Sequence, residues 1–322
     1  MNIIVTGSLG HVGKPLTQML VQRGHSVTVI SSKADRQGEI EALGAKAAIG
    51  LVSDYSFLLK TFTGADIVYL MEPPADLTDK NYDIYRAVNE IAAAYKQAVE
   101  QSGVKKVVHL SGIGAHTDKD IGFLRIHNMA ETILRQLPSD VAIKFMRPVG
   151  FYHNVLAYGD VIKSTSKGFL GGLLALQHYG IGGLLAGHRG MILGNYGGDV
   201  QYLLVAAEDI AAAIGEEMEK PFEGRTVRYI ASEELTCNEI ARILGEAIGK
   251  PYLKHGKISD KMLANTLLKS GINEQMAHGI VEMGVACRTG KVFEDYYKNR
   301  PILGKTKLKE YAAEFARNYL QS

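Results

Sequence analysis

A glycine-rich turn near the start of the chain has the residue types and spacing that bind a dinucleotide phosphate. The segment TGSLGHVG carries Gly7, Gly10 and Gly13 between the apolar run Asn2–Val5 and a helical pattern. Gly7 permits a tight turn, Gly10 removes the Cβ that would block a pyrophosphate, and Gly13 lets the helix pack on the sheet. The N–H groups that open this helix favour phosphate charge. The cofactor contacts expected here are Thr6, Gly7, Leu9, Gly10, His11, Val12 and Gly13.

The end of the second apolar run indicates which dinucleotide is preferred. Ser31, Ser32 and Lys33 stand where an NAD-preferring site places an acidic residue on the ribose 2′-hydroxyl. Two hydroxyls and an ammonium group suit a 2′-phosphate, which an Asp would repel. We therefore expect NADP(H) as the cofactor; the alternative is that Lys33 only points to solvent.

Polar residues also follow three later apolar runs, and the carboxyl ends of strands are where open α/β sheets bind ligands. The sequence MEPP begins at Met71, Ser111 and Gly112 follow the fifth run, and Arg147 starts the segment RPVGFYHN. A Pro-Pro pair lacks two backbone donors and fits a loop along the nicotinamide ribose. The further cofactor contacts expected are Met71, Glu72, Pro73, Ser111, Gly112, Arg147, Pro148 and Phe151.

Hydride transfer to a carbonyl group also needs a proton source near the acceptor. No Tyr-x-x-x-Lys pair follows the fifth run, but FLRIHNMAETIL keeps His127 and Glu131 four residues apart on one helix face. We expect Ser111, His127, Tyr152 and His153 as the catalytic candidates. The alternatives are that His127 and Glu131 are a packing pair and that Tyr152 and His153 line the pocket wall.

These residues require a parallel sheet to bring them together, and the first half of the chain predicts one. Short β-branched runs alternate with helical patterns such as Ile84–Gln101, which is typical of a doubly wound Rossmann α/β fold. A helix over Glu208–Glu219 and a strand over Thr226–Ile230 add a seventh strand. The first six strands are expected at Asn2–Val5, Ser26–Ile30, Lys46–Ile49, Asp66–Met71, Lys106–Leu110 and Ala142–Met146.

The second half predicts a lid and a smaller lobe. Residues 1–155 form the cofactor-binding core, to which residues 199–231 return, and residues 232–322 form a mainly helical substrate lobe that opens with a Thr236–Glu239 capping box. Residues 156–198 are rich in glycine, with 11 glycines between positions 168 and 198. That composition argues against a regular helix or a membrane span. We expect a loop folded over a pocket, or an apolar subunit contact between two copies of the chain.

Composition narrows the class of protein. A net charge of +2 gives no basis for nucleic-acid binding, and KTKLK at Lys305–Lys309 is read as a solvated helix start. The two cysteines, Cys237 and Cys287, form no disulfide framework or metal motif, so we expect no metal and a reducing, cytoplasmic setting. The strand pattern begins at residue 2, which leaves no room for a cleavable signal.

Several motifs together resemble the NmrA-like family of atypical short-chain dehydrogenases/reductases. TGSLGHVG resembles its glycine turn, HLSG at His109–Gly112 its strand-five serine, MRPVGFYHNV at Met146–Val155 its R-P-x-x-F-x-x-N segment, and VAAEDIAAA at Val205–Ala213 its D-I-A helix start. The resemblance spans nearly the whole chain and implies a Rossmann core, a C-terminal substrate lobe and NADP(H). One departure concerns adenine, since Leu51 replaces the family's usual Asp and Asp54 follows three residues later.

The missing Tyr–Lys pair is the second departure, and it limits the chemistry. A quinone accepts hydride with little help from an enzyme acid, because water can protonate the product. We therefore expect an NADPH-dependent reductase of a quinone-like or other conjugated, apolar or aromatic acceptor. A cofactor-binding redox sensor without turnover is the main alternative, and a sugar-nucleotide epimerase or dehydratase is disfavoured because those reactions rely on Tyr and Lys.

Overall fold

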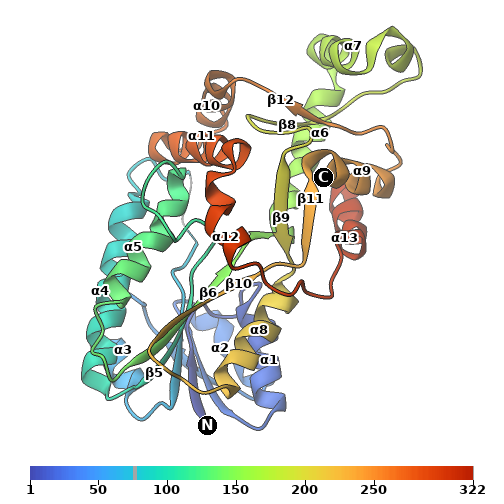
Figure 1. Ribbon diagram of the computed structural model, residues 1–322. Coiled ribbons are helices and arrows are strands. Elements are labelled where there is room, and N and C mark those ends of the chain that lie inside the picture. Colours follow the sequence, from blue (N-terminus) through green and yellow to red (C-terminus); the bar gives the residue numbers. More distant parts are fainter. Residues whose placement is uncertain (75–77, 322) are drawn as a thin grey trace.

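The computed structural model describes residues 1–74 and 78–321, and its centre is a seven-stranded parallel sheet. The strand order is β10-β6-β5-β4-β1-β2-β3, as Figure 1 shows. The predicted doubly wound Rossmann class is confirmed, including the seventh strand, which pairs with β6 from Arg225↔Ile143 to Ile230↔Pro148. The strands are β1 (Asn2–Val5), β2 (Ser26–Ser31), β3 (Lys46–Ile49), β4 (Ile67–Leu70), β5 (Lys106–Leu110), β6 (Ala142–Pro148) and β10 (Arg225–Ile230).

Helices cover both faces of this sheet because its strands alternate apolar side chains between them. In β1, Ile3 and Val5 face the cluster that includes Leu16 and Ile210, whereas Ile4 faces the cluster that includes Tyr95. Figure 1 shows the two layers that result. One layer contains α1 (Gly13–Gln22), α2 (Gln37–Ala42) and α8 (Ala207–Glu219), and the other contains α3 (Tyr55–Phe62), α4 (Ile84–Ser102) and α5 (Arg125–Leu134).

The strand order reverses between β1 and β4, and this reversal fixes where a ligand can bind. Connections from β1 and β4 leave in opposite directions, so a crevice opens outside the carboxyl ends of these strands. In Figure 1, the elements of the C-terminal half other than α8 and β10 lie beyond the carboxyl ends of the sheet strands. The predicted site residues therefore come from loops that surround one crevice.

The C-terminal lobe contains helices and two small sheets that the sequence patterns do not predict. Strands β7 (Gly150–Phe151), β9 (Gln201–Val205) and β11 (Glu233–Thr236) form one sheet, and β8 (Ile192–Gly194) pairs with β12 (His255–Lys257). The Thr236–Glu239 capping box is present at the start of α9. The lobe helices are α6 (Tyr158–Ser166), α9 (Cys237–Ala247), α10 (Asp260–Lys269), α11 (Glu274–Thr289), α12 (Glu294–Lys298) and α13 (Leu308–Gln321), with short turns η3 (Tyr152–Ala157) and η4 (Lys291–Phe293). The short turns of the core are η1 (Ala34–Arg36) and η2 (Gly122–Leu124).

The glycine-rich segment is helical, so the expectation that its glycines exclude a helix is wrong. Helix α7 (Gly168–Leu185) is interrupted at Gly180, whose φ of 70° and ψ of −179° break it into two parts. Glycine adopts this backbone conformation without a steric penalty, so the break keeps most residues helical. In Figure 1, α7 projects beyond α6 and β8, far from the seven-stranded sheet. Its role as a lid stays a prediction.

Two sequence-based exclusions can be compared with the described residues. No helix within residues 1–74 and 78–321 has the length and hydropathy needed to cross a bilayer. The same residues contain no group of three or more His, Cys, Asp or Glu placed to hold a metal ion. Cys237 and Cys287 are both buried free thiols, and burial raises the pKa of each to about 12.

The lobe rests on the core through a close approach between α11 and η2. A Cβ on Gly279 would lie 2.9 Å from the Phe123 Cβ and 3.1 Å from the Phe123 nitrogen, so this helix has no space for a side chain there. Gly122 of η2 has a φ of +60° and faces the Gly279 carbonyl oxygen. Backbone contact at this point holds the lobe beside the start of α5.

We predict that Gly279→Ala lowers the free energy of unfolding by about 1–3 kcal/mol, because overpacking forces two backbones apart. The matched control is Gly38→Ala in α2, where no described atom lies within 4 Å of the new Cβ. The control should leave stability unchanged or slightly raised. Urea midpoints measure both effects, and equal midpoints for the two variants would contradict this account of the contact.

Candidate active site at the carboxyl ends of the strands

The loop between β1 and α1 has the shape of a phosphate cradle. Gly7 has a φ of +86°, and a Cβ there would overlap the Met71 sulfur. Among the described residues, a Cβ on Gly10 would approach only the Gly7 carbonyl oxygen, at 3.4 Å, so this side of the loop is open. Gly13 cannot carry a Cβ because the Ser8 carbonyl oxygen occupies that space. The loop therefore presents an open glycine backbone to a ligand, as a pyrophosphate requires.

The other predicted loop residues divide into supporting and exposed positions. Leu9 and Val12 are buried in the core, and the buried Thr6 accepts a hydrogen bond from the Met71 N–H at 2.9 Å through its Oγ1. Gly10 and His11 are exposed. Thr6, Leu9 and Val12 therefore hold the loop, while Gly10 and His11 lie on the ligand side.

The end of β2 places one hydroxyl inside and two polar side chains outside. Ser31 is buried, and its Oγ accepts a hydrogen bond from the Ser8 hydroxyl at 3.0 Å. Ser32 and Lys33 are exposed. Ser31 thus supports the glycine loop, which leaves Ser32 and Lys33 as the exposed candidates for a 2′-phosphate.

Two further cations stand near this edge, and the sequence analysis misses both. Lys14 at the start of α1 and Arg36 of η1 each form an ion pair with Glu39, at 3.1 and 2.7 Å. Their hydrogen bonds lower the pKa of Glu39, Lys14 more strongly than Arg36. The spacing in KADR could have indicated Arg36, because it lies one helical turn after Lys33 and so on the same side of the chain.

The two residues considered for adenine differ in their surroundings. Leu51 is exposed after β3. Asp54 caps α3, because its Oδ1 accepts a hydrogen bond from the Phe57 N–H at 3.1 Å. This capping role accounts for Asp54 without adenine.

The end of β4 carries a buried carboxylate–histidine pair. Met71 and Glu72 are partly buried and Pro73 is exposed. Both Glu72 oxygens lie 3.1 Å from Nε2 of His109, a fully buried residue of β5. Burial opposes ionisation of Glu72, but the charge and hydrogen bond of His109, with smaller contributions from His127 and the backbone, together lower the pKa of this carboxyl. Glu72, predicted as a cofactor contact, therefore points toward the protein interior. Its partner His109 is not among the residues that the sequence predicts for the site.

His127 lies against the end of β5, next to this pair. A Cβ on Gly112 would overlap the His127 ring, so the imidazole packs directly on the Gly112 backbone. Burial lowers the pKa of His127 to about 4, although the Glu72 charge opposes that shift. The imidazole is therefore neutral at neutral pH and has one N–H to donate.

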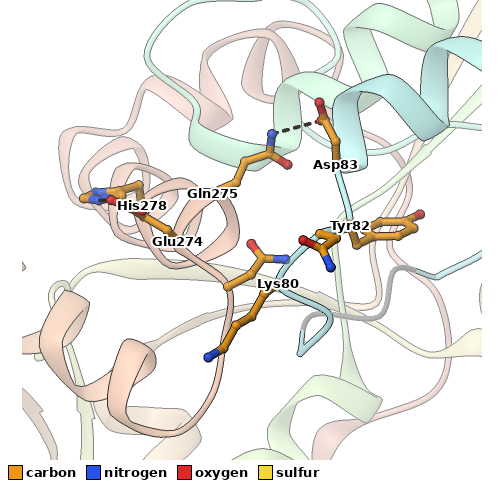
Figure 2. A pocket seen from close by; sticks show the side chains of 8 residues that line it. Lys80, Tyr82, Asp83, Glu274, Gln275 and His278 are labelled. Carbon is orange, nitrogen blue, oxygen red and sulfur yellow. Dashed lines mark hydrogen bonds and ion pairs between the residues drawn. The ribbon is translucent and has the colours of Figure 1, made fainter.

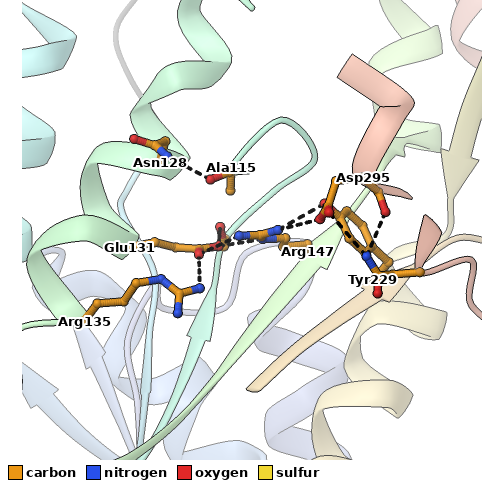
Figure 3. A network of polar contacts seen from close by, with 9 residues as sticks. Ala115, Asn128, Glu131, Arg135, Arg147, Tyr229 and Asp295 are labelled. Carbon is orange, nitrogen blue, oxygen red and sulfur yellow. Dashed lines mark hydrogen bonds and ion pairs between the residues drawn. The ribbon is translucent and has the colours of Figure 1, made fainter. Parts of the chain in front are cut away.

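Glu131 and His127 share one helix but serve different networks, as Figure 3 shows for Glu131. The Arg147 guanidinium binds both Glu131 oxygens, with Nε–Oε1 and Nη2–Oε2 distances of 2.8 Å. The Ser111 hydroxyl donates to Glu131 Oε1 at 2.7 Å, and Arg135 adds an ion pair at 2.9 Å. Ser111, predicted as a catalytic candidate and a cofactor contact, is buried with its hydroxyl engaged by Glu131.

Arg147 extends this network into the lobe. Its Nη1 donates to the Tyr229 hydroxyl and to Asp295 of α12, both at 3.1 Å, and Tyr229 donates to Asp295 at 2.7 Å. Burial opposes ionisation of Glu131, but the hydrogen bond from Arg147 and its charge lower the pKa of Glu131. Arg147 and the neighbouring Pro148 are both buried, and their contact with a cofactor stays a prediction.

Tyr152 lies in the core of the lobe, and its role as a proton donor stays a prediction. Its side chain is fully buried in the lobe core, and its hydroxyl donates to Glu233 Oε2 at 2.8 Å and to the Thr306 carbonyl at 3.1 Å. Burial and Glu233 raise the pKa of Tyr152 well above its ordinary value. Phe151, the residue before it, is partly buried in β7. The Glu233 carboxylate and the Thr306 carbonyl oxygen explain why the Tyr152 hydroxyl points into the lobe.

His153 lies on the opposite side of that segment and meets the glycine loop. Its ring centroid is 3.8 Å from that of His11, and its Nδ1 is 3.5 Å from the Tyr311 hydroxyl. Both histidines reach the surface, and the partial burial of the His153 ring, with the charge of His11, lowers the pKa of His153. The pair closes one side of the crevice over the exposed glycine backbone.

One pocket, of about 500 Å³, lies between the start of α4 and the start of α11. Gln275 bridges the two helices, since it accepts from the Ile84 N–H at 3.1 Å and donates to Asp83 at 2.9 Å. Figure 2 shows polar side chains around it. None of its lining residues is a predicted site residue, and their polarity does not match an apolar acceptor. The lining residues are Lys80, Asn81, Tyr82, Asp83, Asn273, Glu274, Gln275 and His278.

Comparison with known families supports the reading of the glycine loop. The family model described as NAD(P)H-binding matches residues 7–172 of this chain. The match starts at Gly7 and spans the sheet strands β2, β3, β4, β5 and β6. The family match therefore agrees with a dinucleotide bound at the glycine loop.

Individual relatives cover nearly the whole chain at low identity. An NAD(P)H azoreductase of Xenophilus azovorans is 23% identical over 282 residues, which are 87% of this chain and 85% of the relative. The triphenylmethane reductase of Citrobacter sp. complexed with NADP(H) has a TM-score of 0.73 at 20% identity and covers 98% of this chain and 99% of its own. The NADPH-dependent quinone oxidoreductase of Escherichia coli complexed with NADPH has a TM-score of 0.71 at 18% identity and covers 97% and 99%. The structural matches show a shared fold.

We predict that Glu131→Gln lowers the free energy of unfolding by about 3–5 kcal/mol, because it leaves the Arg147 charge buried without its carboxylate. The pKa of Glu131 lies below the ordinary 4.5, so its contribution is complete above that value and is lost as pH falls through the lowered pKa. Acid unfolding should therefore be less steep in the variant.

The matched control is Asp140→Asn, which removes the exposed ion pair with Lys105. It should leave the midpoint of urea unfolding nearly unchanged. A Glu131→Gln variant as stable as this control at neutral pH would contradict the structural role of the network.

Proposed function

The chain belongs to the NAD(P)H-binding family, and on this basis we propose that it is an NADPH-dependent reductase of a quinone-like or other conjugated, apolar acceptor. The observation that carries this proposal is the pairing of an open glycine cradle with a neutral histidine at the end of β5. The cradle fits a dinucleotide, and His127 stands beside Gly112 where an acceptor would meet it. When bound, the reduced nicotinamide supplies hydride.

The cofactor side of the site is formed by the loops after β1, β2 and β4. We infer that the backbone of Gly10 and His11 holds the pyrophosphate and that Ser32 and Lys33 hold the 2′-phosphate. Lys14 and Arg36 add positive charge that Glu39 only partly offsets. This surplus favours the additional phosphate of NADPH over NADH.

The acceptor side lacks a strong acid, which suits a reactive acceptor. Tyr152 is buried on Glu233, and His127 is neutral at neutral pH because its pKa is about 4. A neutral imidazole N–H can orient an acceptor oxygen by hydrogen bonding, but it gives up its proton reluctantly. Hydride transfer to a quinone tolerates this arrangement, because water can protonate the reduced product.

The names of the relatives agree with this class of acceptor. Azo dyes, triphenylmethane dyes and quinones are conjugated molecules with large apolar surfaces. We infer a similar acceptor for this chain, bound between the end of β5 and the C-terminal lobe. The two buried thiols fit the cytoplasmic setting that we also infer.

A non-catalytic NADP(H)-binding sensor is the second candidate. The observation that favours it is the use of Ser111 and Arg147 in a structural network with Glu131. Ser111 and Arg147, which lie at strand ends beside the crevice, therefore stabilise the fold and are not free to contact an acceptor. A sensor needs the cradle but no acceptor site, so turnover distinguishes the two functions.

We predict that Lys33→Ala weakens NADP⁺ binding by about tenfold and leaves NAD⁺ binding unchanged, because only NADP⁺ carries the 2′-phosphate. Fluorescence titration or calorimetry with both cofactors measures this. Lys60→Ala, on the exposed end of α3, is the matched control. Equal affinities for the two cofactors, unaffected by Lys33→Ala, would contradict the assignment of the 2′-phosphate site.

We predict that the purified protein oxidises NADPH when quinones are added and that Gly10→Glu abolishes this activity by blocking the cradle. His127→Gln should retain most quinone reduction but lose about tenfold or more with an azo dye, which depends more on a positioned donor. NADPH absorbance follows both reactions. Tight NADPH binding without oxidation by any acceptor would exclude the reductase and favour the sensor.

A further inference from the structure

Helix α7 carries an apolar surface that the proposed reaction does not use. Phe169, Ile181 and Leu185 are 89%, 70% and 82% exposed. Leu173 and Leu176 are also exposed, on the first part of the helix. Because isolated exposed apolar residues are common but a group on one projecting element is not, this surface indicates a partner.

The charged residues of the sequence segment that contains α7 are of one sign. Between Asp160 and Asp199 the chain contains no acidic residue, whereas it contains three basic ones, Lys163, Lys167 and Arg189. Lys167 directly precedes the helix, and both Lys167 and Arg189 are exposed. The apolar surface is thus bounded by positive charge at its base.

A second segment adds to this basic base. The Lys250 ammonium donates to the Arg189 carbonyl oxygen at 3.0 Å, and the Lys254 ammonium lies 5.9 Å from the centre of the Tyr179 ring. Lys254 is exposed. Lysines from the loop before β12 therefore gather at the same end of the projecting helix.

Aromatic contacts fix α7 to this base, so the surface has a defined direction. Tyr179 donates to the Gly190 carbonyl oxygen at 2.8 Å and meets the edges of His188 and Tyr252. His188 stacks on Tyr252 with a centroid distance of 3.9 Å. In Figure 1, α7 lies beyond α6 and β8. Tyrosine is enriched at membrane–water interfaces, so tyrosines beside exposed apolar residues fit such a surface.

We propose that α7 binds the surface of an anionic lipid membrane. Phe169, Ile181 and Leu185 enter the boundary between headgroups and acyl chains, while Lys167, Arg189 and Lys254 contact the lipid phosphates. Apolar burial combined with attraction of basic residues is what holds peripheral helices on anionic membranes. The helix lies on the membrane and does not cross it, in agreement with the absence of a spanning helix among the described residues.

The charge pattern favours a membrane over a second copy of the chain. A symmetric dimer through α7 would bring two sets of Lys167 and Arg189 together, with no acidic residue between positions 161 and 198 to neutralise them. An anionic lipid surface neutralises all of them at once. Membrane binding by α7 does not depend on NADPH or on turnover, so it is tested independently of the reductase function.

The test is co-sedimentation of the full chain with vesicles, without cofactor or acceptor. We expect binding to vesicles of equal parts phosphatidylcholine and phosphatidylglycerol, and little binding to phosphatidylcholine alone. Leu185→Asp and Ile181→Asp should each weaken binding by about tenfold or more, because a charge replaces a buried apolar side chain. Lys167→Glu with Arg189→Glu should remove the preference for anionic lipid.

The matched control is Ile302→Asp, since Ile302 is 99% exposed and precedes α13 rather than belonging to α7. This variant should bind vesicles as the wild type does, and thermal melting of all variants checks that they fold. Absence of wild-type binding to anionic vesicles would overturn the proposal. An equal loss of vesicle binding in Ile302→Asp would also overturn it. A third contradicting result is a dimer, found by analytical ultracentrifugation, that Ile181→Asp dissociates, together with no vesicle binding by any variant.

Discussion

The buried ion pair between Glu131 and Arg147 is the interaction on which the rest of the crevice depends. It joins α5 to β6, receives the Ser111 hydroxyl from the end of β5, and reaches Tyr229 of β10 and Asp295 of α12. A charge pair removed from water is stable only if its remaining donors and acceptors are also satisfied. These contacts satisfy them, and in doing so they align three strand ends and the lobe around one opening.

This use of polar residues determines what chemistry is left. Helix α5 carries Glu131 for the ion-pair network and His127 against Gly112. Tyr152, the phenol predicted as a proton donor, is held by Glu233 in the lobe core. The proposed reaction is therefore one in which orientation of the acceptor matters more than proton transfer from the enzyme. The Glu72–His109 pair beneath His127 keeps a carboxylate in this corner without exposing it to solvent.

Glycine has three different roles in this chain, each set by its surroundings. Gly10 leaves space for a ligand, Gly279 lets two backbones meet, and Gly180 breaks a helix that projects from the lobe. Composition alone treats these positions as equivalent. The helix α7 shows the consequence, because a segment with many glycines remains helical where a single residue absorbs the turn.

The sequence by itself determined the features that repeat locally. Alternation and helical spacing predicted all seven strands of the main sheet, the Thr236–Glu239 capping box and the glycine loop, because each depends on neighbours within a few residues. The tertiary structure decided which distant groups meet. His11 contacts His153, His109 pairs with Glu72, and Tyr152 turns to Glu233, although nothing in the local pattern around these residues selects the partner. Burial and hydrogen bonding across long stretches of chain made those choices, and only the folded arrangement of loops and lobe brings the partners within reach.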